Sequence, residues 1–109
     1  MHCVLTGSST ELEVPLGVTA EGGAIRVAIR AGDILVADRE PVGLSARNVL
    51  PGEVVDYALH GSTVVATIDA GARFVVHLTP GGADTLGLRQ GARMWLVIKT
   101  YSCRVARYS

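Results

Sequence analysis

Cysteine and histidine, the residue types that most often bind transition metals, are few and widely separated in this chain. Cys3 and Cys103 have no second Cys or His at a zinc-like spacing. We therefore interpret both as free thiols. His2, His60 and His77 fall near the terminus, in an expected turn and in an expected strand. We expect no site for a free metal cation.

Nucleotide hydrolysis is not expected either. Gly82 and Gly87 have the spacing of a phosphate-binding loop, but that loop continues with Lys and then Ser or Thr. Here the residues that follow are Leu88 and Arg89. No Ser/His/Asp arrangement and no paired carboxylates stand out. We expect a protein that is not an enzyme and that binds no nucleotide.

Several side chains that donate hydrogen bonds remain as candidates. Arg47 offers a rigid fork of donors, Lys99 a second positive charge, and Ser45 and Thr79 hydroxyl groups. A ligand that carries only acceptor oxygens needs such donors, with no carboxylate nearby to repel it. Each residue also has an ordinary explanation, as a loop residue, a surface cation, an edge-strand charge or a helix cap. Residue type alone leaves both interpretations open.

The order of short motifs from Leu44 onward resembles the Mop/TOBE family of molybdate-binding domains. Residues 44–52, Leu-Ser-Ala-Arg-Asn-Val-Leu-Pro-Gly, are similar to the opening Ser-Ala-Arg-Asn motif of that family. Residues 78–88 and 97–102 carry two further similar segments in the same order. Residues 25–37 resemble, more loosely, the stretch that introduces this module in the ATP-binding subunits of molybdate ABC importers.

This resemblance implies an all-β, OB-fold-like small barrel of the Mop/TOBE type with one short helix. It implies molybdate or tungstate as the ligand, bound as an oxyanion at interfaces between copies of the chain. The implied role is regulation, sensing or storage associated with molybdate ABC transport, with an ABC transporter ATP-binding domain as a further partner. Carried over by position, the oxyanion contacts are Ser45, Arg47, Thr79, Lys99 and Ser102.

Two other functions stay open. A structural dimerisation module of a transporter subunit, without ligand binding, would fit two departures from the family pattern. Tyr101 stands where a small hydroxyl residue is frequent, and Gly82 where a serine is frequent. An OB-type nucleic-acid-binding module is the other alternative, but such modules use exposed aromatic platforms. Trp95, Phe74 and Tyr57 are expected to pack within strands.

The elements that must position these residues are mostly strands. Alternating, β-branched patterns predict strands at 24–30, 33–37, 53–59, 62–69, 73–79 and 93–99. Glycines 32, 52, 61, 71 and 91 are expected in turns that need positive φ. One short helix is expected near Pro80 to Leu86, capped by Thr79 and ended by Gly87. Closely spaced short strands of this kind are typical of a sandwich or a barrel.

Length, composition and charge limit which classes of protein are possible. The 109 residues suffice for one compact domain, and 49% are hydrophobic although only five residues are aromatic. Ten basic and ten acidic residues give no overall field that would attract nucleic acid or anionic lipid. No apolar stretch approaches the roughly 20 residues that span a bilayer, and Glu11 and Glu13 interrupt any signal peptide. A cytoplasmic protein without direct membrane insertion is therefore expected.

A joint near residues 39–43, which contain Pro41, divides the chain. We expect residues 1–40 to form N-terminal strands that complete or accompany the barrel, and residues 44–109 to form the oxyanion-binding unit. The first unit is below the size that usually folds alone. It should therefore pair with the second unit or with another copy.

Overall fold

The computed structural model describes residues 2–4, 10–14 and 25–107. Its strands are β1 (His2–Val4), β2 (Glu11–Glu13), β3 (Ile25–Ala28), β4 (Leu35–Ala37), β5 (Asn48–His60), β6 (Thr63–Asp69), β7 (Arg73–Leu78), β8 (Arg93–Ile98) and β9 (Arg104–Arg107). The helices are the 3₁₀ turns η1 (Ala31–Asp33) and η2 (Thr100–Ser102) and the α-helix α1 (Pro80–Leu86). This composition confirms a mostly β protein with one short α-helix. No helix in the described ranges is long and apolar enough to cross a membrane.

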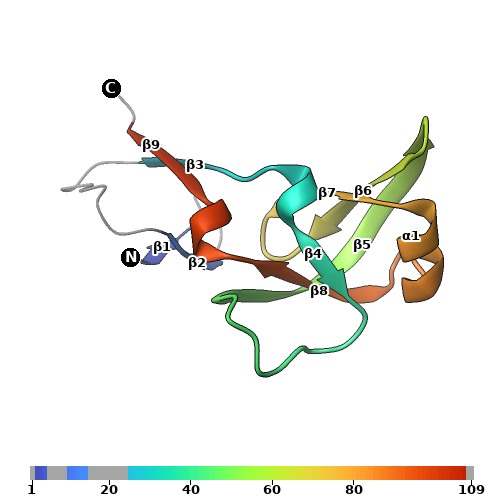
Figure 1. Cartoon of the computed structure of the whole chain (residues 1–109), viewed down its shortest axis with the longest axis horizontal. Coiled ribbons are helices and arrows are strands. Elements are labelled where there is room, and N and C mark those ends of the chain that lie inside the picture. Colours follow the sequence, from blue (N-terminus) through green and yellow to red (C-terminus); the bar gives the residue numbers. More distant parts are fainter. Residues whose placement is uncertain (1, 5–9, 15–24, 108–109) are drawn as a thin grey trace.

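The largest sheet has five antiparallel strands in the order β4–β8–β5–β6–β7 (Figure 1). Strand β5 pairs with β8 from Asn48 to Glu53 and with β6 from Glu53 to His60. A register shift between Val54 and Asp56 forms a bulge, which bends the strand. Because β5 pairs with β8 along its first part and, after the bend, with β6 along its second part, the sheet curls. The turn η1, just before edge strand β4, contacts the other edge strand, β7.

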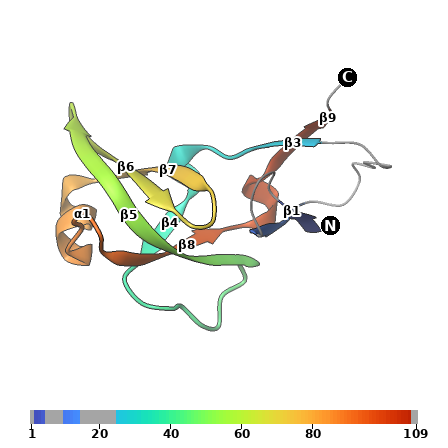
Figure 2. The ribbon, with the colours of Figure 1, turned by 180° about the vertical axis from the view of Figure 1, so that it is seen from behind.

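Two smaller antiparallel sheets, β1–β2 and β3–β9, complete the described structure. Both lie at the end of the molecule opposite α1, as the front and rear views agree (Figure 1, Figure 2). The N-terminal strands are thus distributed over the molecule: β4 lies on the main sheet, β3 pairs with β9, and β2 is hydrogen-bonded to Asn48 at the start of β5. The division of the chain into two units stays a prediction.

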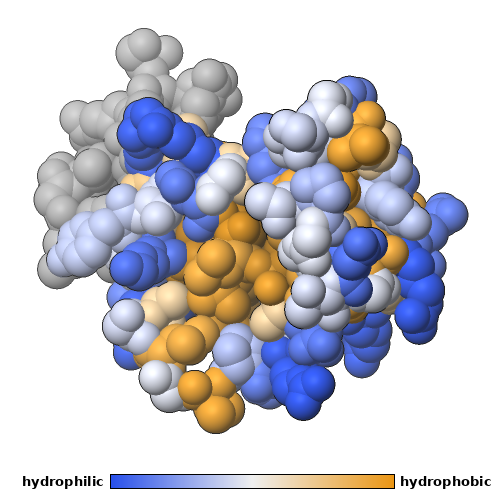
Figure 3. All heavy atoms as spheres, turned by 45° about the vertical axis from the view of Figure 1, so that its right-hand side comes forward, coloured by the Kyte–Doolittle hydropathy of each residue, from blue (hydrophilic) through white to orange (hydrophobic). Residues whose placement is uncertain are grey.

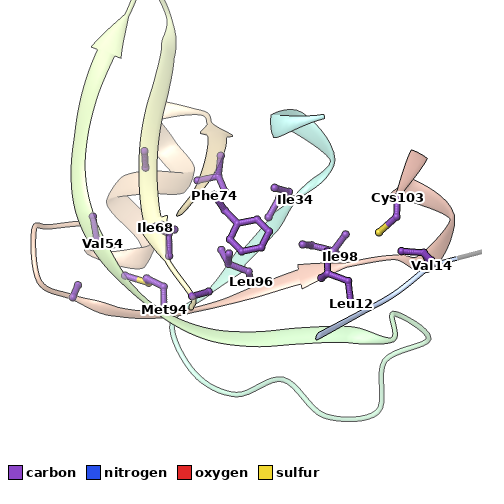
Figure 4. Close-up of a cluster of buried hydrophobic side chains, with 14 residues drawn as sticks. Leu12, Val14, Ile34, Val54, Ile68, Phe74, Met94, Leu96, Ile98 and Cys103 are labelled. Carbon is purple, nitrogen blue, oxygen red and sulfur yellow. The ribbon is translucent and has the colours of Figure 1, made fainter. Parts of the chain in front are cut away.

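One hydrophobic core runs through these sheets. Alternate residues of β6, β7 and β8 point into it, as period-two patterning requires. Its largest fully buried members are Leu12, Val14, Val54, Ile68, Val76, Leu96 and Ile98 (Figure 4). Leu86 and Leu88 pack against it from the region of α1 and anchor the short helix. Because Leu12 and Val14 share this core with β8, burial of apolar surface holds β2 against the main sheet.

The glycines confirm three of the five expected turns. Gly61, Gly71 and Gly91 have positive φ, and Gly87 ends α1 in the left-handed conformation. The expectation was wrong for Gly32 and Gly52, which do not have positive φ. Gly32 lies within η1, which also replaces the expected strand start at Asp33.

Pro51 and Gly52 lie inside β5 instead of in a turn. Pairing with β6 begins only at Glu53, so at Pro51 the strand has β8 as its one neighbour and the missing proline N–H costs no ladder bond. A Cβ built on Gly52 would lie 2.8 Å from Ile68 Cγ2 and 3.0 Å from the Asp69 carbonyl oxygen. Glycine is thus needed here for close approach to the end of β6.

We predict that Gly52→Ala destabilises the fold. The added methyl meets the fully buried Ile68 side chain and the main chain of Asp69, so overpacking should cost about 1–3 kcal/mol. Gly32→Ala is the matched control, because a Cβ added at Gly32 would have no atom within 4 Å and the φ of this residue is not positive. Thermal unfolding should show a lower melting temperature for Gly52→Ala alone. Equal melting temperatures for the two variants would contradict this account of β5.

Candidate functional site

The loop that enters β5 and the turn that leaves β8 meet at one end of the main sheet. Asn48 pairs with Ile98, the last residue of β8. Arg47 and Lys99 come directly outside this antiparallel pair and therefore lie on neighbouring chain segments. They line one pocket, which we call the Arg47 pocket. Its residues are Glu13, Ser45, Arg47, Lys99, Thr100 and Tyr101.

A second pocket adjoins the first and shares Ser45 and Lys99 with it. We call it the Ser102 pocket. It is lined by Gly32, Asp33, Leu35, Leu44, Ser45, Ala46, Val97, Lys99 and Ser102. Four of the five residues that the sequence suggested as oxyanion contacts therefore line two adjoining pockets.

Thr79 is the residue that the single chain does not bring to these pockets. It precedes α1, which lies at the opposite end of the molecule from η2 (Figure 1). Its hydroxyl oxygen accepts a hydrogen bond of 3.0 Å from the Gly82 N–H, which confirms the expected helix cap. As an oxyanion contact Thr79 stays a prediction, and a second copy of the chain would have to bring it there.

The Arg47 pocket also contains a carboxylate that sequence reasoning missed. Arg47 Nε donates to Glu13 Oε2 at 3.3 Å, and Thr100 Oγ1 donates to Glu13 Oε1 at 3.3 Å. The arginine side chain is 68% exposed and the glutamate side chain 24%. No local signal could have revealed this group, because its partners lie 34 and 87 residues away in sequence.

Asn48, the last residue of the Ser-Ala-Arg-Asn segment, is a buried polar anchor. Its side-chain oxygen accepts from the Glu13 main-chain N–H at 2.7 Å, and its amide nitrogen donates to the Glu13 carbonyl at 2.9 Å. Asn48 is 4% exposed, and Cys103 Sγ lies 4.0 Å from its amide nitrogen. The asparagine thus holds β2 as a neighbouring strand would, with one donor and one acceptor. Within the Ser-Ala-Arg-Asn segment, the arginine contacts the side chain of Glu13 and the asparagine its main chain.

The predictions for the cysteines and the aromatic residues agree with the structure only in part. Cys103 is a buried thiol whose sulfur donates to the Lys99 carbonyl oxygen at 3.7 Å, and the side chain of Cys3 lies outside the described residues. Phe74 is buried in the core, as expected for a packing residue. The same expectation was wrong for Tyr57, which is 47% exposed. Tyr57 lines a different pocket, together with Leu59 of the β5–β6 hairpin, and contributes to neither the Arg47 pocket nor the Ser102 pocket.

The donors of the Arg47 pocket suit an anion with several acceptor oxygens. The arginine fork can hold two oxygens, while Lys99, Ser45 and Thr100 can meet others. The pocket volume is about 360 Å³, against the roughly 10–15 Å³ that one water molecule needs. A small tetrahedral oxyanion would therefore fit loosely in the single chain. Further contacts would be needed to select an anion by its size.

These features define a small, curled all-β module with two adjoining pockets, which share Ser45 and Lys99, at one end of its sheet. The model of the TOBE domain matches residues 44–105, starting at the leucine before the Ser-Ala-Arg-Asn segment. The match covers more than half of the 109 residues, and the chain belongs to the TOBE domain family.

Two relatives are ATP-binding proteins named for molybdenum import. The chain is 38% identical over 101 residues to the molybdenum import ATP-binding protein ModC of Mesorhizobium japonicum, covering 91% of this chain and 27% of ModC. It is 34% identical over 91 residues to ModC of Rhizobium meliloti, covering 82% and 26%. The chain therefore spans about a quarter of the length of these relatives.

A solved structure confirms the OB-like fold. The cytoplasmic molybdate-binding protein ModG, crystallised with molybdate bound, superposes with a TM-score of 0.79. The match covers 94% of this chain and 79% of the ModG chain, at 23% sequence identity. The two chains therefore share their fold.

We predict that Asn48→Ala destabilises the protein, because it removes the two hydrogen bonds between the Asn48 side chain and the Glu13 main chain. Losing two such bonds in a partly buried site costs about 1–3 kcal/mol. Asn48→Asp should also be destabilising, since a carboxylate can accept from the N–H but cannot donate to the carbonyl. Ser45→Ala, in the exposed part of the same segment, is the control. Unfolding in urea would check this, and parent-like stability of Asn48→Ala would refute the anchoring role.

Proposed function

We propose that this TOBE domain binds molybdate or tungstate as a regulatory, sensing or storage module associated with molybdate ABC transport. The binding surface comprises Ser45, Arg47 and Lys99 of the Arg47 pocket together with Ser102 of the adjoining pocket. Thr79 completes the set from another copy. Protein and oxyanion interact through charge-assisted hydrogen bonds and not through metal coordination by His or Cys.

The single observation that carries this proposal is the convergence of donors from two distant segments. Ser45 and Arg47 precede β5, and Lys99 follows β8, yet all three line one pocket. Convergence of this kind is not expected of unrelated surface residues in a chain whose net charge is zero. Molybdate at neutral pH carries acceptor oxygens only, so donors are what a site for it needs.

The relatives and the solved structure support the same ligand class. The relatives in Mesorhizobium and Rhizobium are named for molybdenum import, and ModG is named for binding molybdate. We infer that this domain acts beside an ATP-binding domain of a molybdate importer in the cytoplasm. Nucleotide chemistry in such an assembly would belong to that ATP-binding domain. Molybdate and tungstate are so alike in charge and shape that residue types give no reason to separate them.

A structural dimerisation role without ligand is the second candidate, and one observation favours it. The Arg47 pocket holds the Glu13 carboxylate, which would repel a dianion, and Tyr101 at its rim is 88% exposed. A shift in melting temperature on adding molybdate or tungstate separates the two candidates. Ligand that binds the native state raises the melting temperature, whereas a purely structural module would not respond.

We predict that Arg47→Ala weakens molybdate binding by at least about tenfold, equivalent to 1.4 kcal/mol, because two charge-assisted hydrogen bonds are lost. Arg47→Lys should give an intermediate affinity, since it keeps the charge and loses the fork. Stability should change little, because the Arg47–Glu13 ion pair is largely exposed. Titration calorimetry of the parent and both variants is the measurement.

Arg39→Ala is the matched control for this prediction. Arg39 lies in the same connection between β4 and β5, its side chain is 86% exposed, and its described ion pair is with the adjacent Asp38. Its loss removes the same formal charge at a site outside the two pockets. Parent-like affinity in Arg47→Ala, or equal losses in the two variants, would rule out the specific role assigned to Arg47.

We also predict self-association, because apolar side chains gather on the surface as well as in the core (Figure 3). Leu35 is 66% and Leu44 49% exposed, and both line the Ser102 pocket. Light scattering should give a multiple of 11.4 kDa. Leu35→Asp should lower that mass, whereas Leu59→Asp at the other end, where Leu59 is 63% exposed, should not. A parent protein of monomer mass at working concentration would contradict this prediction.

A further inference from the structure

Glu13 occupies the place in the Arg47 pocket where an anion would meet its best donors. Its two carboxylate oxygens accept from different residues, Oε2 from Arg47 and Oε1 from Thr100. Bridging two donors in this way is what a bound oxyanion would do with two of its own oxygens. The carboxylate therefore makes the same two contacts that a bound oxyanion would make at this position.

The negative charge of Glu13 makes the Arg47 pocket less favourable for an anion. Arg47 and Lys99 supply two positive charges, and the glutamate supplies one negative charge. A dianion would bring this local sum to minus one with the carboxylate in place and to zero without it. The carboxylate has no proton to donate, so it offers an oxyanion repulsion and no hydrogen bond.

We propose that Glu13 is an affinity-setting residue whose carboxylate competes with the oxyanion for Arg47 and Thr100. This inference rests on the proposed function, molybdate or tungstate binding at the Arg47 pocket. The Arg47 side chain of this ion pair is 68% exposed, so a dianion can reach the guanidinium and compete with the carboxylate for it. The carboxylate thus lowers the affinity of the site without closing it.

The main chain of Glu13 helps to hold β2 in position independently of the carboxylate. Asn48 binds the main chain of Glu13 through both its N–H and its carbonyl, and the neighbouring Leu12 side chain is 1% exposed in the core. Because these main-chain and core contacts do not involve the carboxylate, they can persist when the carboxylate rotates away from Arg47 and Thr100. Replacing it should change the charge of the pocket while β2 stays in place.

The experiment measures molybdate affinity by titration calorimetry for the full chain and three variants. Glu13→Gln keeps the shape and removes the charge, and Glu13→Ala removes the charge without introducing an amide that could donate to the ligand. Glu11→Gln is the matched control. Glu11 lies two residues earlier on β2, is exposed, and is not among the described residues that line the Arg47 pocket.

The expected result is that both Glu13 variants bind molybdate about tenfold more tightly than the parent, with Glu11→Gln within about twofold of it. Tighter binding in Glu13→Gln alone would mean that the new amide causes the gain, and would overturn the inference. An equal gain in Glu11→Gln would also overturn it, because the effect would then be one of net charge.

The two proposals fail in different ways. If the parent binds molybdate and both Glu13 variants bind it equally or more weakly, competition by Glu13 is wrong and the binding function stands. If neither the parent nor any Glu13 variant binds molybdate or tungstate, both proposals are overturned. Melting temperatures without ligand, expected to be close to that of the parent for all three variants, show that each comparison is made between folded proteins.

Discussion

The two hydrogen bonds between the Asn48 side chain and the Glu13 main chain are the interaction on which the site depends. They join β2, from the first part of the chain, to the start of β5 in a position where the asparagine is almost fully buried. A buried amide must have its partners, because an unpaired polar group costs more than a formed hydrogen bond gains. The pairing therefore places β2 at one position, and with it the Glu13 carboxylate beside Arg47. Movement of β2 along β5 would leave the amide unpaired and remove Leu12 from the core.

The bend of β5 is the second constraint, and it explains where reasoning from local sequence was wrong. A Pro-Gly pair between apolar runs indicates a turn when only neighbouring residues are considered. In the folded chain Pro51 lies where β5 has one neighbour, and Gly52 lies against Ile68, so the same two residues suit the interior of a strand. Whether Pro51 and Gly52 form a turn or lie inside a strand depends on how β5 pairs with β8 and β6. A short stretch of sequence does not include these partner strands. The turns at Gly61, Gly71 and Gly91 were predictable because each connects consecutive elements.

The candidate site could be predicted in part for the same reason. Ser45, Arg47, Lys99 and Ser102 belong to segments that resemble a known family, and the structure brings them to adjoining pockets. Thr79 suited both a helix cap and a ligand contact, and within one chain its hydroxyl caps α1. Glu13 and Thr100 could not be found, since they meet only after β2, β5 and η2 assemble. Asn48 was visible in the motif, but its role depends on a partner 35 residues earlier in the chain.

The anchoring of β2 by its main chain also limits what anion binding can do to the rest of the fold. A ligand shifts an equilibrium only through a difference in its affinity for the two states, and that coupling is the same in both directions. If the oxyanion displaces the Glu13 carboxylate, the state it favours differs from the unliganded one in a side-chain rotation, because Asn48 holds the main chain in both. Binding then changes the charge presented by β2 at the surface more than the position of the strand. A signal to a neighbouring domain or copy would in that case be electrostatic, carried by a glutamate released from Arg47, and would weaken as added salt screens exposed charges.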